Sequence, residues 1–332
     1  PEVSFWRRAW HSLLRTRWPI VALLILSLVI FLAVFGPQIA PKDPNRITLA
    51  ARLKPPFERN AQGELVYILG TDSLGRDVLS RILWGGRISL IVSLTAIAAA
   101  IVIGGAVGMI AGYVGGRFDA FVMQVMDVLL SFPSLILGLI VVALLGPDLV
   151  NLVVAIGLTA IAPFARIARA PVLALKERAF VEAGRALGYS HARILFVHIL
   201  PNILSEVLVM GSLWMATAVR TEASLSFIGL GVKPPTPTWG GMMRDGFENI
   251  LDAPWLAIFP GIAILLLVLG LFIILFGARG ELHRFLSARN LQVLVHGDIL
   301  TAVAALGMLL IIISVDERYA PPITRFMAGI FG

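Results

Sequence analysis

"ISLIVSLTAIAAAIVIGGAVGMIAGYVGG", residues 88–116, is a long apolar run that contains no charged residue. The hydrocarbon core of a bilayer is about 30 Å thick, and an α-helix crosses it with about 20 apolar residues. Another run, 203–229, is interrupted only by Glu206, Arg220 and Glu222. The remaining runs are 18–41, 128–147, 149–165 and 253–278, with a shorter one at 299–315. Because backbone groups in lipid must bond internally, the sequence predicts an all-α membrane protein, folded as a helical bundle.

The composition agrees with a membrane protein. Of the 332 residues, 58% are apolar and only 14% are charged, against about a quarter charged in soluble domains. The net charge of +7 does not indicate nucleic-acid binding, because the basic residues lie near the ends of the apolar runs, where orientation signals occur. We therefore expect contact with membrane lipid and not with nucleic acid. The absence of cysteine excludes disulfides and thiolate chemistry.

The distribution of Lys and Arg predicts how the chain is oriented. Short loops on the cytoplasmic side of a membrane carry an excess of these residues, which favours a multi-pass chain with a cytoplasmic N-terminal segment, 1–17. The run 18–41 is too long for a cleavable signal peptide and lacks a small-residue cleavage site, so we interpret it as the first membrane helix. The loop 42–87 is then external, and the polar segment 170–200 is cytoplasmic.

The loop 42–87 divides into two parts. Its first part, "PKDPNRITLAARLKPP", contains prolines that exclude a long helix. Its second part, "TDSLGRDVLSRILWGG", has apolar residues on roughly one helical face, namely Leu74, Val78, Ile82 and Leu83. Thr71 or Asp72 could cap this helix. The pattern predicts a short amphipathic helix at the membrane surface, before a core that extends over 88–278.

A polar segment, 170–200, separates two apolar runs, and we refer to it as the cassette. Good helix formers extend from about Ala170 to Leu187, where Gly188 offers a left-handed stop. Ser190 can cap the next turn, and Pro201 is expected to open the following membrane helix. The pattern predicts two short helices joined by a corner. On spacing alone, a solvated connector is the favoured interpretation of this segment.

The sequence within the cassette carries a more specific signal. Glu182, Ala183, Gly188 and then Leu200 and Pro201 have the spacing of the EAA signature, which is found in permease subunits of bacterial ABC importers. The stretches "LGTDSLGRDVLSRILWGGRISL", "MDVLLSFPSLILGL", "RALGYSHARILFVHILPN" and "EASLSFIGLGVKPPTPTWGGMM" resemble the dipeptide, oligopeptide and nickel importer permeases, in particular the second of their two membrane subunits. The resemblance departs from the signature at two positions, Gly184 and His198.

This resemblance implies an architecture and a set of partners. The fold would be the six-helix core of a type I ABC importer permease in the bacterial plasma (inner) membrane. A second, related permease would complete the pathway as a heterodimer, two ABC ATPase subunits would bind from the cytoplasm, and a substrate-binding protein would dock from outside. The cassette would be a coupling helix seated in a groove of one ATPase.

The residues of the cassette suit that role. Small residues would allow a close approach to a partner, aromatic and aliphatic residues would anchor in a pocket, and Glu182 and Arg185 would fix the register by charge. The small residues are Ala183, Gly184, Ala186 and Gly188, and the anchors are Phe180, Val181, Leu187 and Tyr189.

The sequence does not indicate an enzyme. It contains neither a phosphate-binding G-x-x-x-x-G-K-[ST] loop nor an H-E-x-x-H motif, and its histidines are scattered. We therefore expect no cofactor and no metal in this chain, and we expect ATP and Mg to be bound by the partner ATPases.

Two features within the apolar runs predict further roles. Gly104, Gly108 and Gly112 recur every four residues, a pattern that lets helices touch backbone to backbone. Arg220 and Glu222 are ionisable residues in an apolar span, which favours positions that line the transport pathway. Because they are two residues apart, they do not share a helix face.

The substrate class stays open at this level. Dipeptides, longer peptides, glutathione-like compounds and chelated nickel are all compatible with the resemblance. A stand-alone secondary transporter is the contrasting class, but it would need inverted repeats and a central ion site, and the sequence shows no convincing repeat.

The C-terminal segment, 279–332, departs from the pattern of these permeases, and it contains the apolar run 299–315. That run would form about 25 Å of helix, which is close to the thickness of the hydrocarbon core. Its apolar residues leave no polar face, so we predict a seventh membrane helix with 319–332 outside the cell.

This topology is testable because the chain has no cysteine. A cysteine introduced at Ala328 should react with a membrane-impermeant maleimide on intact cells. Labelling that occurs only after lysis would contradict an external tail.

Overall fold

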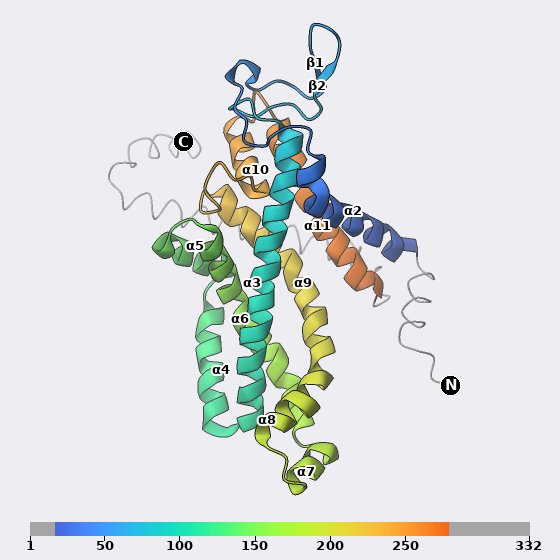
Figure 1. Cartoon of the computed structure of the whole chain (residues 1–332). Helices are drawn as coiled ribbons and strands as arrows, with labels where there is room; N and C mark the ends of the chain where they lie inside the picture. The colour runs from blue at the N-terminus through green and yellow to red at the C-terminus, as the bar shows by residue number, and fades with distance from the viewer. Residues whose placement is uncertain (1–16, 279–332) are drawn as a thin grey trace, which may run out of the picture. The chain divides into compact units, whose positions relative to one another are not determined.

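The computed structural model describes residues 17–278, with side chains described for 24–271. The described part is predominantly helical (Figure 1). The helices are α2 (Arg17–Ile39), α3 (Val78–Val114), α4 (Gly116–Ser131), α5 (Ser134–Leu145), α6 (Leu149–Leu175), α7 (Ala179–Ala186), α8 (His191–Arg193), α9 (Leu200–Phe227), α10 (Trp239–Glu248) and α11 (Trp255–Ala278). A short antiparallel pair, β1 (Glu58–Arg59) with β2 (Leu65–Tyr67), and a 3-10 turn at Leu49–Ala51 complete it. The predicted helix 299–315 lies outside the described residues.

The long apolar helices have the dimensions of membrane spans. Three continuous helices are long and apolar enough to cross a bilayer: Val78–Val114, Leu149–Leu175 and His191–Phe227. Shorter apolar stretches lie in α2 and α11, at Leu24–Ile39 and Trp255–Leu271. The predicted all-α membrane fold is confirmed.

The predicted span 128–147 differs from the structure. Its first residues belong to α4, and the chain then bends by 89° into α5. The cause is Pro133, because the residue before a proline is disfavoured in the α region, and Phe132 is accordingly extended. The two helices together can serve as one broken span.

The prediction of a separate amphipathic helix in 42–87 was wrong. The helix begins at Val78, where the Asp77 side chain accepts a hydrogen bond from the Ser80 backbone N–H, and it continues without a break to Val114. Its 37 residues make α3 about 55 Å long, well beyond the thickness of a hydrocarbon core. Gly85 and Gly86 lie within α3, and the Trp239 ring packs against them.

The N-terminal end of α3, which follows β1 and β2 in the chain, is held by a polar network. Contrary to the prediction, Asp72 does not cap the helix. Its carboxylate pairs with Arg76 at 2.6 Å and with Arg81 at 3.4 Å. Arg81 also donates to the Pro44 carbonyl, and Arg76 lies 3.6 Å from Asp245 of α10. Burial raises the pKa of the Asp245 carboxyl, and the nearby Arg76 opposes that shift. The network fastens the loop and α10 to the start of α3.

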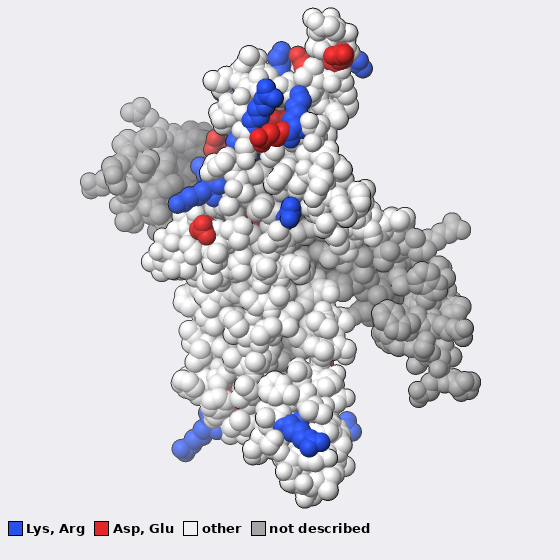
Figure 2. Space-filling model, viewed as in Figure 1, with Lys and Arg blue, Asp and Glu red and all other residues white. Residues whose placement is uncertain are grey.

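Figure 2 shows how charge is distributed on one face of the described part. Acidic and basic side chains gather toward the end with the sheet, and basic side chains appear at the end with α7. Largely uncharged side chains cover the zone between them, as expected for a surface that contacts lipid or another apolar subunit.

The predicted glycine seam packs α3 against α6. A Cβ atom added at Gly108 would lie 1.9 Å from the Ala165 carbonyl oxygen, and one at Gly104 would lie 2.4 Å from the Ile161 carbonyl oxygen. At Gly112 the nearest atom would be the Arg169 carbonyl oxygen, at 3.2 Å. The backbones therefore approach so closely that only glycine fits at the first two positions.

We expect Gly108→Ala to destabilise the bundle by about 1–3 kcal/mol, because the added methyl group forces α3 and α6 apart. The midpoint of thermal unfolding in detergent measures the effect. Gly105→Ala is a matched control on the same helix, since no atom lies within 4 Å of a Cβ there. Equal midpoints for the two variants would contradict the seam.

Candidate functional site

The cassette forms a compact projection at one end of the bundle (Figure 1). The predicted helix from Ala170 to Leu187 is interrupted: α6 ends at Leu175, and the backbone N–H of Arg178 closes a turn by donating to the Leu175 carbonyl. α7 then starts at Ala179, and the chain turns at Gly188, whose φ of +76° is left-handed. This first break could not be predicted, because neither glycine nor proline lies between residues 172 and 179.

The entry into the next membrane helix was predicted in part. The Ser190 side chain accepts a hydrogen bond from the Arg193 backbone N–H, which confirms the cap. Pro201 lies in the first turn of α9, as predicted, although helical structure runs without a gap from His191. A π-helix at Ile194–Ile199 precedes the proline, and the Leu200 N–H donates to the Leu195 carbonyl, five residues back. The wider turns accommodate a residue that has no N–H.

The predicted contact residues of the cassette divide between two faces of α7. Val181 is only 1% exposed and packs into the hydrophobic core, and Gly184 is buried against Tyr189. The other face is open, with Leu187 71% exposed and Phe180 43% exposed. Its remaining exposed residues are Glu182, Ala183, Arg185, Ala186 and Gly188. In this structure Val181 and Gly184 therefore attach the cassette to its own bundle rather than face a partner.

Tyr189 also has an internal role, because it is half-buried within the cassette. Its ring stacks on His198, with 5.6 Å between the centroids and an angle of 6° between the planes. The Arg193 guanidinium lies 4.2 Å from the centroid of the same ring. A cation over an aromatic face is attractive, so these contacts stiffen the corner after α7.

Arg220 and Glu222 point in different directions, as their spacing predicted. Arg220 is exposed, whereas Glu222 is fully buried and accepts a hydrogen bond from the Ser226 hydroxyl at 2.8 Å. Ser89 and Ser93 of α3 are buried as well, and within the described residues their hydroxyls have no hydrogen-bond partner. The role of Arg220 and Glu222 in lining a pathway stays a prediction.

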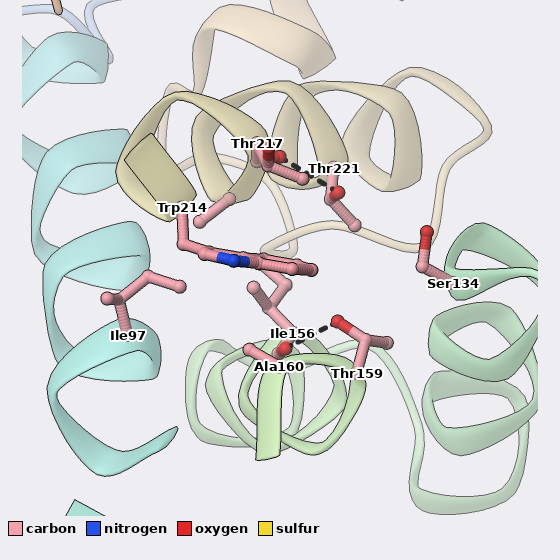
Figure 3. A pocket seen from close by; sticks show the side chains of 9 residues that line it. Ile97, Ser134, Ile156, Thr159, Ala160, Trp214, Thr217 and Thr221 are labelled. Atoms are coloured by element: carbon pink, nitrogen blue, oxygen red, sulfur yellow. Dashed lines mark hydrogen bonds between the residues drawn. The ribbon is translucent and has the colours of Figure 1, made fainter. Parts of the chain in front are cut away.

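A small pocket lies among α3, α5, α6 and α9 (Figure 3). The Trp214 side chain projects into it, and the hydroxyls of Thr159 and Thr221 donate to carbonyls of their own helices. The other lining residues are Ile97, Ser134, Ile156, Ala160, Thr217 and Ala218. The sequence did not indicate this pocket, because its residues come from four distant segments. It presents no charged group to a ligand.

Comparison with known proteins identifies the family. The family described as "Binding-protein-dependent transport system inner membrane component" matches residues 104–287, which is more than half of the chain. The chain belongs to this family. Residues 4–56 of the permease also match the "N-terminal TM domain of oligopeptide transport permease C". The predicted resemblance is confirmed.

Individual relatives cover most of the permease. It is 38% identical to a dipeptide transport system permease protein (DppC) of Alkalihalophilus pseudofirmus over 84% of this chain and 90% of the relative. It is 37% identical to a di/tripeptide transport system permease protein of Pseudomonas aeruginosa over 82% and 90%. A glutathione transport system permease protein (GsiD) of Pectobacterium atrosepticum is 38% identical over 83% and 90%.

We expect Gly188→Val to loosen the corner of the cassette. A β-branched residue at a φ of +76° is strained by about 1–2 kcal/mol, although no neighbouring atom lies within 4 Å of a Cβ there. Limited trypsin digestion of the purified permease should then cleave faster in the cassette, at Arg185 or Arg193. Gly188→Asn is the matched control, because asparagine tolerates this conformation. Equal cleavage of both variants would contradict a conformational role for Gly188.

Proposed function

We propose that this permease forms half of the pathway of an ATP-driven, binding-protein-dependent importer for di- or oligopeptides or a similar small solute. The names of the relatives support this substrate class, since they refer to dipeptides, tripeptides and glutathione. These names favour peptides over chelated nickel. They also favour a subunit of a transport system over a stand-alone secondary transporter.

The exposed face of α7 carries the proposal of an ATPase partner. Phe180 and Leu187 are large, exposed apolar side chains of the cassette. They lie close in sequence to the exposed charged residues Glu182 and Arg185. Apolar anchors surrounded by charged residues are typical of protein interfaces. A groove on a cytoplasmic ATPase subunit would bury the anchors, and the charged pair would set the register. Two such ATPases would bind ATP and Mg, for which this chain has no sequence motif.

The chemistry of a peptide supports a second permease subunit. A dipeptide at neutral pH carries an ammonium and a carboxylate, and burying either without a partner is costly. The pocket in Figure 3 offers neither charge, so it is a poor peptide site. We infer that the pathway forms where this chain meets a related permease, as a heterodimer, and receives substrate from an external binding protein.

The proposed arrangement of subunits also defines the orientation of the chain in the membrane. The N-terminus lies in the cytoplasm, which places the cassette on the ATPase side and the β1–β2 loop on the side of the binding protein. The basic residues of the cassette agree with this assignment.

We expect Glu182→Lys to lower peptide uptake by about tenfold or more, because it reverses a charge at the proposed ATPase interface. The measurement is uptake of labelled dialanine by liposomes that contain the complete importer, together with peptide-stimulated ATP hydrolysis. Glu177→Lys makes the same change at an exposed position before α7 and serves as the matched control. Normal uptake with normal stimulation in Glu182→Lys would contradict the coupling role.

A further inference from the structure

The C-terminal turn of α3 is contacted by both arms of the cassette. From the arm before α7, the Lys176 ammonium donates to the Gly112 carbonyl at 3.0 Å. From the arm after α7, the His191 Nδ1 atom lies 2.9 Å from the Tyr113 hydroxyl. The two aromatic rings meet edge to face, with 5.7 Å between their centroids. Adjacent residues of α3 are therefore held from the two ends of α7.

α7 itself adds a third contact. The Arg185 guanidinium lies 5.7 Å from the centroid of the Tyr113 ring, within the range of a cation–π interaction. The side chain of Tyr113 thus meets α7 through its ring and α8 through its hydroxyl. The buried residue Val181 adds an apolar contact between α7 and the bundle.

α3 is well suited to carry a displacement away from this point. It is one unbroken helix of 37 residues, and it packs on α6 through the glycine seam. Its opposite end is fastened to the polar network of Arg81, Asp72 and Pro44. Because packed helices and polar networks shift between discrete arrangements, a movement at Tyr113 would act on the far end of the molecule.

We propose that Tyr113 is a positioning residue of the transport reaction: its hydrogen bond with His191 ties the displacement of α7 to α3. This proposal rests on the proposed function, in which α7 binds an ATPase. The bond joins residues 78 positions apart, so it is a tertiary contact rather than part of a local turn. It would not be required for ATP hydrolysis itself, only for its conversion into transport.

Tyr113→Phe tests the proposal in the complete importer reconstituted with its binding protein, because it removes the hydroxyl and keeps the ring under Arg185. We expect the number of ATP molecules hydrolysed per labelled dialanine transported to rise about fivefold. A factor of about five corresponds to the free-energy contribution of one typical hydrogen bond. His191→Phe should have the same effect, and the double variant should be no worse than either single one, since all three lose one bond. Tyr67→Phe on β2 is the matched control.

The outcomes separate this proposal from the proposed function. Wild-type stoichiometry in Tyr113→Phe, alongside lost uptake in Glu182→Lys, would overturn the role of Tyr113 and leave the function intact. Wild-type behaviour of both variants would overturn the role of Tyr113 and also the coupling role of α7 on which the proposal rests. A reduced amount of assembled complex, or a lower thermal midpoint with unchanged stoichiometry, would show a merely structural role and would also overturn the proposal.

Discussion

The backbone contact between α3 and α6 is the constraint on which the rest of the bundle depends. At Gly104 and Gly108, a carbonyl oxygen of α6 occupies the space where any other residue would place its Cβ atom. In a lipid environment, where apolar surface gains little by leaving the solvent, such close approach is a main source of helix association. Phe164 and Ala168 of α6 are fully buried beside this contact, and α9 and α5 pack around the same core.

Because α3 is fixed along its length, its two ends become the places where the structure can respond to partners. One end starts with the Asp77 cap and is enclosed by the Asp72, Arg76 and Arg81 network. The other end, at Gly112 and Tyr113, meets the cassette. Polar and charged groups at both ends contact specific neighbours, whereas the middle of the helix is apolar. The polar contacts at its two ends therefore fix the position of α3.

The cassette combines attachment and presentation in one short helix. The eight residues of α7 are too few to form a stable helix alone, so buried Val181 and Gly184 must hold it against the bundle. That attachment leaves Phe180 and Leu187 exposed. A helix of this kind presents a fixed surface because its inner face is packed, which explains why only part of the sequence signature is open to a partner.

The sequence by itself determined the features that depend on local chemistry. The apolar runs 88–116, 149–165 and 203–229 specify membrane helices, a left-handed φ favours Gly188, and a hydroxyl beside a free N–H makes Ser190 a cap. The four-residue spacing of the glycines was also sufficient to predict a seam. The tertiary structure alone decided that Glu222 is buried while Arg220 is exposed. It also decided that Tyr113 meets His191, because periodicity assigns a residue to a helix face, but only the packing of distant segments determines what that face contacts.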